Sequence, residues 1–393
     1  RGLWLVRMGL SLYDLFAKDK RFPRYRVHRG GSPGVPRIDP DRYRWLCSYS
    51  DAQMRYPERF VVALLEDARR VAEERGVEFR VLTHHRAFAQ KPGFFFKTGL
   101  LEGEEPGFSE EAKLRDLLQP AVVVNATGAW GDLTLRELEV ESPRLFGGTK
   151  GSHFVTYHRS LRDALGDDGV YAEAGDGRLV FVLPFGDGTL VGTTDERFTE
   201  RPERAAASQE ELGYLLGMAN RLFPQAGLTE TDIELHYSGV RPLPAASVAT
   251  TAAISRGHSI IEHTGPPPVL TLIGGKLTTC RAFAEETADR VFSLLGHART
   301  AGTRERPVPG GENYPASGAE LQAEHERIAA RFALPVAQIR AVWSLCGNRV
   351  EAIFADLPDL SPRTISGTDF PAAYARWVIE HEWAWTLPDL VER

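Results

Sequence analysis

Two glycines and a lysine separate an apolar run from a helical pattern in the stretch LTLIGGKLTTCRAFAEE, residues 270–286. The apolar run predicts a strand over 269–273, and the spacing after it predicts a helix from about 278 to 295 with a threonine cap. Glycine lets a ligand approach the backbone, and a helix N-terminus offers free N–H donors to which Lys276 adds a positive charge. The stretch predicts a site for an anion, or for a group that becomes anionic in a reaction. An ordinary capped turn is the alternative.

Two arginines follow predicted strands or turns earlier in the chain. Arg241 lies in YSGVRPLPAAS, just after a predicted strand and Gly239, and Arg256 lies fifteen residues later in AISRGHSI. Two guanidinium groups on neighbouring segments can form a fork for a phosphate or a carboxylate. Surface ion pairs, the commoner role of arginine, are the alternative.

Two further motifs combine strands with polar or small residues. TKGSHFV places His153 at the start of a predicted strand, where it could accept a proton at neutral pH or serve only the structure. VVVNATGAWGD is a buried strand that ends in Asn125, Ala126, Thr127 and Gly128. Small residues at a strand's carboxyl end suit a backbone that lies against a cofactor, although a tight turn has the same composition.

Other patterns exclude several functions. GGSPG fits the serine-hydrolase pattern but lies in a proline-rich coil, and GGKLTT lacks the spacing of a phosphate-binding P-loop. The three cysteines form no CxxC pair, so no metal site is predicted and a reducing compartment fits. A net charge of −6 argues against a nucleic-acid partner. No apolar run reaches the roughly 18 residues of a membrane span, and no signal peptide is apparent.

The remaining patterns predict a mixed α/β chain. Helical spacing covers about 2–17 and the segment PERFVVALLEDARRVAEERG, where Gly76 suits a C-terminal cap, and VEFRVL predicts a strand over 77–82. Short strands dominate about 145–265, interrupted by one amphipathic helix near 212–223. Residues 318–393 read as helical.

Six motifs in register resemble the FAD-dependent glycerol-3-phosphate dehydrogenases. They are VVVNATGAWGD, TKGSHFV, RLVFVLPFGDGTLVGTTDE, YSGVRPL, AISRGHSI and IGGKLTTCR, and the likeness covers nearly the whole chain. The fold that this resemblance implies has three parts. They are a truncated Rossmann-like FAD-binding domain (1–144 and 266–300), a β-rich substrate domain (145–265) and a C-terminal helical domain (310–393).

Two departures from that family are apparent. The family opens with a strand and a G-x-G-x-x-G turn that hold the ADP part of FAD, and no such turn occurs here. Residue 1 is arginine rather than methionine, so we expect the sequence to be a fragment. An inactive fragment unable to hold FAD therefore stays an alternative.

The resemblance implies oxidation of sn-glycerol 3-phosphate to dihydroxyacetone phosphate, with hydride transfer to FAD and electrons passed to a membrane quinone. It implies that Arg241 and Arg256 grip the phosphate and that His153 is the base for the C2 hydroxyl. Lys276 would stabilise the reduced flavin as a fourth catalytic residue. The implied cofactor contacts are Asn125, Ala126, Thr127, Gly128, Gly274, Gly275, Lys276, Leu277, Thr278 and Thr279.

The same resemblance implies a cytoplasmic protein that meets the membrane surface peripherally, with no nucleic acid as partner; a homodimer is left open. The apolar helix near 2–17 could touch lipid or pack inside the protein. A related flavoprotein that oxidises an amino acid or hydroxy acid is a second enzymatic interpretation, in which an arginine binds a carboxylate. The presence of two arginines favours phosphate.

Overall fold

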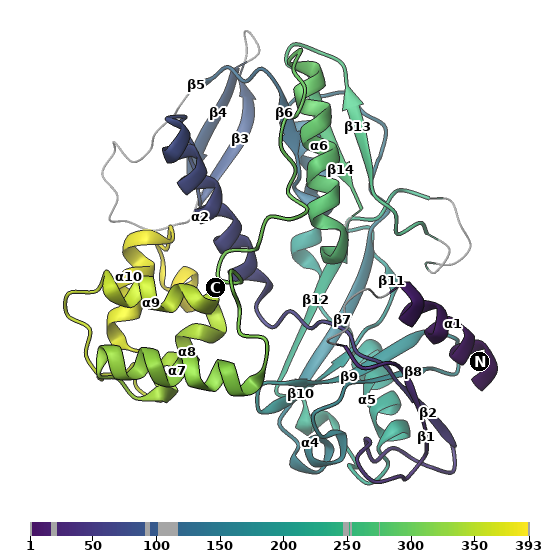
Figure 1. Cartoon of the computed structure of the whole chain (residues 1–393). Helices are drawn as coiled ribbons and strands as arrows, with labels where there is room; N and C mark the ends of the chain where they lie inside the picture. The colour runs from purple at the N-terminus through teal and green to yellow at the C-terminus, as the bar shows by residue number, and fades with distance from the viewer. Residues whose placement is uncertain are drawn as a thin grey trace. The chain divides into compact units, whose positions relative to one another are not determined.

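A computed structural model describes residues 2–16, 22–90, 95–100, 117–246, 251, 254–274 and 276–391 (Figure 1). The chain divides into two compact units. The first comprises Arg1–Ala52, Ala87–Gly99 and Ser109–Thr300, and the second comprises Gln53–Arg86, Leu100–Phe108 and Ala301–Arg393.

A six-stranded antiparallel sheet forms the centre of the first unit. Its strands are β7 (Thr149–Thr156), β8 (Val170–Glu173), β9 (Leu179–Phe185), β10 (Gly188–Gly192), β11 (Glu196–Arg197) and β12 (Leu235–Arg241). The order is β11-β7-β10-β9-β8, and β12 also pairs with β7. This sheet lies within the region predicted to be rich in short strands.

One face of this sheet carries the hydrophobic core. Because side chains alternate along a strand, Phe154 of β7 and Val191 of β10 point to the same side. There they join a buried cluster with α4 (Arg159–Leu165) and α5 (Gln209–Leu222), which includes Leu215 and Leu222. The opposite face carries the odd-numbered residues of β7, among them His153. Packing of the core thus fixes which side chains of β7 lie on the opposite face.

A smaller sheet contains the opening motif. It comprises β6 (Val123–Asn125), β13 (Ser259–His263) and β14 (Val269–Ile273), in the order β13-β14-β6. The strand predicted at 269–273 is confirmed, and β14 runs parallel to β6. After β6 come a 3-10 turn, η2 (Gly128–Trp130), and α3 (Gly131–Glu137). After β14 come η6 (Leu277–Thr279) and α6 (Cys280–Leu294), so the predicted helix begins with a 3-10 turn.

The first unit also contains α1 (Leu3–Phe16) and an antiparallel pair, β1 (Arg26–Arg29) with β2 (Trp45–Ser48). The helix predicted near 2–17 is thereby confirmed. A further three-stranded sheet is formed by β3 (His85–Gln90), β4 (Phe95–Leu100) and β5 (Leu117–Leu118).

The second unit is helical. Its helices are α2 (Pro57–Arg75), α7 (Gly318–Phe332), α8 (Val336–Cys346), α9 (Val350–Ala355), α10 (Ala372–His381) and α11 (Leu387–Val391). Buried apolar side chains from α7 to α10 form its core. A buried ion pair also ties α2 to this unit, since Arg59 donates to Glu382 at 2.7 Å. Helices cover much of the stretch 318–393 that was predicted to be helical, but residues 356–371, between α9 and α10, are not helical.

Two predictions were made for the C-terminal end of α2 and the residues that follow it, and only the first is correct. Gly76 adopts the left-handed conformation (φ 65°) and caps α2 as predicted. The strand predicted at 77–82 is wrong, because within the described ranges these residues pair with no strand and most of them are exposed. Alternating hydrophobicity without a partner does not make a strand.

The division into FAD-binding, substrate-binding and helical parts remains a prediction. Within the part of the chain that the structure describes, no helix has the length and apolar character needed to cross a bilayer.

Candidate functional site

Three segments that the sequence singled out meet in the first unit. The Gly274 amide, just after β14, donates to the Pro242 carbonyl at 2.8 Å, next to Arg241. A Cβ on Gly274 would lie 2.3 Å from the Gly257 carbonyl oxygen, next to Arg256. With its φ of +85°, Gly274 therefore permits close approach of the 257 backbone. Gly275 lies outside the described residues.

Both arginines reach the carboxylate of Asp195, which follows β10. The Arg241 Nη1 lies 3.1 Å from Asp195 Oδ1, and the Arg256 Nη2 lies 3.8 Å from Asp195 Oδ2. Arg241 also donates to the Thr193 hydroxyl at 3.0 Å and the Thr194 carbonyl at 3.1 Å. The predicted juxtaposition of the two guanidinium groups is thus present in the structure.

The two arginines differ in how firmly they are held. The Arg241 side chain is 26% exposed and makes three hydrogen bonds, whereas the Arg256 side chain is 56% exposed. Burial and the nearby Arg256 charge lower the pKa of Arg241, and Asp195 opposes this. Arg241 remains charged at neutral pH because a guanidinium ionises far above it. The pair therefore combines one fixed and one loosely held cation.

Glycines make room for Arg241 and His153 on the face of the large sheet opposite the α4–α5 core. A Cβ on Gly151 would lie 2.2 Å from Arg241 Nη2, and one on Gly192 would lie 2.1 Å from His153 Cδ2. Gly192 of β10 is directly opposite His153 of β7. The two candidate side chains thus lie over the sheet at positions where a residue larger than glycine at 151 or 192 would displace them.

His153 sits between aromatic rings. Its ring stacks on Tyr237 at 5.0 Å between centroids and lies 5.7 Å from Phe181. Burial, and secondarily the charge of Arg241, lower the pKa of His153 to about 4. Within the described residues, its buried Nδ1 has no hydrogen-bond partner. The ring is therefore neutral at physiological pH and can accept a proton, although it is a weak base.

β6 ends at Asn125, which pairs with Thr271, and β14 continues for two more residues to Ile273. The buried Asn125 amide donates to the Gly131 carbonyl at 3.0 Å and accepts from the Thr127 hydroxyl at 2.7 Å. Gly128 takes a positive φ of 62°. These contacts fix the loop after β6, while Ala126 and Thr127 are exposed.

The turn before α6 is more open. Lys276, Leu277 and Thr278 are exposed. Thr279 occupies the cap position, but its side chain makes no capping hydrogen bond and donates instead to the Lys276 carbonyl at 3.0 Å. The predicted threonine cap is therefore wrong. The Thr279 amide donates to the Lys276 carbonyl and the Cys280 amide to the Leu277 carbonyl, so amide donors available to an anion at this end belong to η6 rather than to the first turn of α6.

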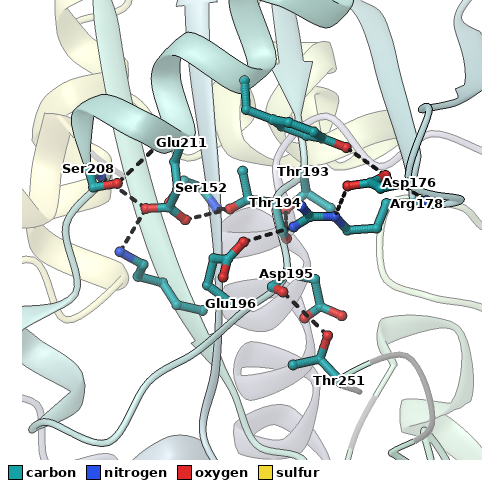
Figure 2. A network of polar contacts seen from close by, with 12 residues as sticks. Ser152, Asp176, Arg178, Thr193, Thr194, Asp195, Glu196, Ser208, Glu211 and Thr251 are labelled. Carbon is teal, nitrogen blue, oxygen red and sulfur yellow. Dashed lines mark hydrogen bonds and ion pairs between the residues drawn. The ribbon is translucent and has the colours of Figure 1, made fainter. Parts of the chain in front are cut away.

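The sequence interpretation missed a polar network behind the sheet (Figure 2). Asp195, although part of the motif GTTDE, was not singled out, and neither was Glu211 of α5. Glu211 forms a capping box with Ser208, a pattern readable in SQEE. Lys150 contacts Glu211 at 2.7 Å, so it belongs to this network.

Comparisons with known proteins point to one family. The family described as FAD dependent oxidoreductase (DAO) matches residues 14–290. A glycerol-3-phosphate dehydrogenase of Synechocystis sp. is 29% identical over 430 residues, covering 100% of this chain and 71% of that protein. A D-erythritol 1-phosphate dehydrogenase of Brucella abortus is 28% identical over 412 residues, covering 100% of this chain and 75% of that protein.

A solved structure agrees on the fold. The glycerol-3-phosphate dehydrogenase of Bacillus halodurans, solved with FAD, matches with a TM-score of 0.62 at 22% identity. The match covers 81% of this chain and 59% of the Bacillus chain, so this chain spans somewhat more than half of that protein. The predicted fold class is confirmed by this likeness together with the family match. On this evidence, the chain belongs to the FAD-dependent oxidoreductase family.

Proposed function

We propose that the protein oxidises sn-glycerol 3-phosphate to dihydroxyacetone phosphate. The observation that carries the proposal is the meeting of Arg241 and Arg256 at Asp195, on the sheet face that also holds His153. Two guanidinium groups suit a phosphate, which has more charge and more acceptor oxygens than a carboxylate. Relatives that match along the whole chain are named for dehydrogenation of phosphorylated polyols.

FAD is the cofactor of this family. Two features of the strand-end region support a flavin here: β6 and β14 are parallel and end within two residues of each other, and η6 and α6 begin without a side-chain cap. The residues proposed to hold it are Asn125, Ala126, Thr127, Gly128, Gly274, Gly275, Lys276, Leu277, Thr278 and Thr279. When bound, FAD accepts the hydride that leaves C2 of the substrate.

The side chains on the sheet face, together with Lys276, are proposed to bind the phosphate, accept a proton and supply positive charge beside the cofactor. Arg241 and Arg256 bind the phosphate, and Arg241 sets its position because hydrogen bonds hold it in place. His153, neutral at physiological pH, accepts the C2 hydroxyl proton, since hydride leaves more readily from the alkoxide. Lys276 supplies positive charge beside the cofactor contacts.

Quinone is the proposed electron acceptor, at the cytoplasmic face of a membrane. The helix α1 supports contact with lipid, because none of its residues is buried. Trp4 is 80% exposed, and Leu15 and Phe16 are exposed to a similar degree. An apolar helix surface of this kind can lie in a bilayer interface.

A longer polyol phosphate is the second candidate substrate. The relative named D-erythritol 1-phosphate dehydrogenase is 28% identical to this chain, almost as similar as the Synechocystis relative at 29%. The phosphate contacts proposed for Arg241 and Arg256 would serve either substrate, so other residues must discriminate between the two carbon-chain lengths.

Flavin reduction separates these functions. The purified protein is supplied with FAD, freed of excess, and mixed without oxygen with sn-glycerol 3-phosphate, D-erythritol 1-phosphate, glycine or lactate, while flavin absorbance is followed. Rapid bleaching by a phosphorylated polyol supports the proposal. Bleaching only by glycine or lactate overturns it in favour of an amino-acid or hydroxy-acid oxidoreductase, and failure to retain flavin supports the inactive fragment. Reoxidation by a soluble quinone compared with dioxygen tests the acceptor.

A further inference from the structure

The face of the large sheet that packs against α5 carries hydroxyl groups directly behind His153. Ser152 precedes His153 in β7, and Ser238 of β12 pairs with Ser152 in the register that places Tyr237 opposite His153. Because side chains alternate along a strand, the two serines point towards α5, while His153 and Tyr237 point to the other face. The stacked rings of His153 and Tyr237 therefore each have a serine as a chain neighbour.

Thr194 connects Arg241 to the α5 side in a comparable way. Its carbonyl accepts from Arg241 at 3.1 Å, and its two neighbours Thr193 and Asp195 accept from the same guanidinium at 3.0 and 3.1 Å. The Thr194 hydroxyl, in contrast, donates to Glu211 of α5 at 2.6 Å. One residue thus links a candidate phosphate-binding arginine to α5.

Glu211 receives both connections on one carboxylate oxygen. Its Oε1 accepts from the Thr194 hydroxyl at 2.6 Å and from the Ser152 hydroxyl at 2.8 Å (Figure 2). Since Ser152 gives its only hydroxyl hydrogen to Glu211, the Ser238 hydroxyl donates to Ser152, at 2.7 Å. Glu211 is therefore the common end of contacts from β7, β12 and the segment after β10.

The second oxygen of Glu211 holds the carboxylate itself in place. Its Oε2 accepts from the Ser208 amide at 2.9 Å and contacts the Lys150 ammonium at 2.7 Å. Burial would raise the pKa of Glu211, but the four donors together lower it to about 2, so the group is ionised at neutral pH. An ionised acceptor makes stronger hydrogen bonds than a neutral one, which suits Glu211 to fix the residues around it.

We infer that Glu211 is a positioning residue that sets the places of both His153 and Arg241 from the opposite face of the sheet. It acts on His153 through its contact with Ser152, and on Arg241 through its contact with Thr194. The inference rests on the proposed function of the same site, in which His153 accepts a proton and Arg241 binds the phosphate.

The physical reason is that both groups must meet a single substrate. Proton transfer and phosphate binding act on the same molecule, so the distance between His153 and Arg241 matters as much as the place of each. A misplacement of about 1 Å can lower a rate about a hundredfold. A single carboxylate behind both strands keeps the two groups in one fixed relation.

Phosphate binding tests the contact with Thr194 without turnover. Inorganic phosphate is titrated by calorimetry at pH 8 into the wild-type protein and T194V, both fully folded. T194V keeps the shape of the side chain but not its hydroxyl, so it should bind phosphate about tenfold more weakly. T194S restores the hydroxyl and should recover most of this loss. The double variant E211A/T194V should bind no more weakly than E211A, because both changes break one contact.

The titration of His153 tests the contact with Ser152. In the wild type, burial and secondarily the charge of Arg241 lower the pKa of His153 to about 4. In S152A the ring is held less firmly against Tyr237 and is better hydrated, so its pKa should rise towards the ordinary 6.5. NMR follows the ring proton signal, which is assigned by its absence from H153F. An unchanged pKa in S152A, or unchanged phosphate affinity in T194V, overturns the inference.

E210Q is the matched control, since it removes the same charge from the exposed neighbour of Glu211 on α5. Both the phosphate affinity and the His153 titration should be those of the wild type, whereas E211A should change both. Equal changes in E210Q and E211A would show a general effect of charge on α5 and overturn the inference. A loss of stability alone lowers the folded fraction but moves neither quantity in folded molecules.

The inference and the proposed function fail in different ways. T194V and S152A decide the inference even if E211A does not fold. If the wild type binds phosphate and its flavin is reduced by substrate, while T194V and S152A behave like the wild type, the inference alone is overturned. If the wild type binds no phosphate, the proposed function is overturned and the inference with it.

Discussion

The two sides of the candidate site are built differently. On the large sheet, Arg241 and Asp195 are fixed by side-chain hydrogen bonds and by a buried network behind them. At the end of β14, the turn that carries Lys276 is shaped by the backbone, and Lys276 itself is exposed. The sheet side of the candidate site is thus held in place by its own side-chain contacts, while the turn at Lys276 offers an exposed charge rather than rigid side-chain geometry.

The largest effect expected from this difference is on substrate binding. R241A should lower kcat/KM for sn-glycerol 3-phosphate about a thousandfold, because it removes a fixed cation and leaves Asp195 without its closest partner. R256A should lower it only about tenfold, since that side chain is exposed. Steady-state kinetics with glycerol as the uncharged control check this. Equal losses for both substrates would remove Arg241 from phosphate binding.

The next largest effect is expected on stability, at Glu211, whose buried carboxylate accepts hydrogen bonds from Thr194 and Ser152. Burial alone would raise the pKa of Glu211, but Lys150, the Ser208 amide, Thr194 and Ser152 together lower it to about 2. Because the folded-state pKa lies below the unfolded value, this stabilisation is complete above about pH 4.5 and is lost as the pH falls towards 2. E211A should reduce the free energy of unfolding by about 3 kcal/mol at pH 7, measured by urea denaturation.

E210Q is the control for E211A, since Glu210 is the exposed neighbour of Glu211. It should change the free energy of unfolding by no more than about 0.5 kcal/mol. A similar loss in both variants would mean that α5 responds to any lost charge rather than to the network.

A smaller effect on stability is expected from the protonation of His153. Its folded-state pKa of about 4 lies below the ordinary 6.5, so the unfolded chain binds the proton more readily and stability falls as the pH drops from about 6.5 to 4. H153F keeps an aromatic ring against Tyr237 and removes the titration. At pH 5 the wild type should have lost about 2 kcal/mol relative to pH 8 that H153F retains. Identical pH profiles would contradict this environment for His153.

The smallest effect on stability is expected at the turn before α6. K276M should change the free energy of unfolding by less than about 0.5 kcal/mol, because the side chain is exposed. In the flavin-loaded protein, the proposed function implies a flavin potential more negative by about 30 mV, because the charge proposed to lie beside the reduced ring is lost. A spectroscopic redox titration measures this shift. A large loss of stability without a shift would give Lys276 a structural role instead.

Much of the fold was readable because its signals are local. The apolar run of β14, the glycine cap of α2 and the periodicity of α5 each depend on residues close in sequence. The strand predicted at 77–82 is wrong because a strand depends on a pairing partner elsewhere in the chain, which a local hydrophobic pattern does not reveal. The threonine cap failed because Thr279 bonds its own turn instead of the helix amides.

The same limit applies to the candidate site. The sequence identified its chemical groups singly, as two arginines, a histidine and a lysine at a glycine turn, but not their arrangement. The sequence by itself determined these residue types, the order of the elements and, through the family motifs, the class of cofactor. Only the tertiary structure decided that Arg241 and Arg256 share Asp195 and that burial keeps His153 neutral. The physical reason is that charge, burial and hydrogen bonding depend on distances between segments far apart in the chain, which pairing across β7, β10 and β12 sets.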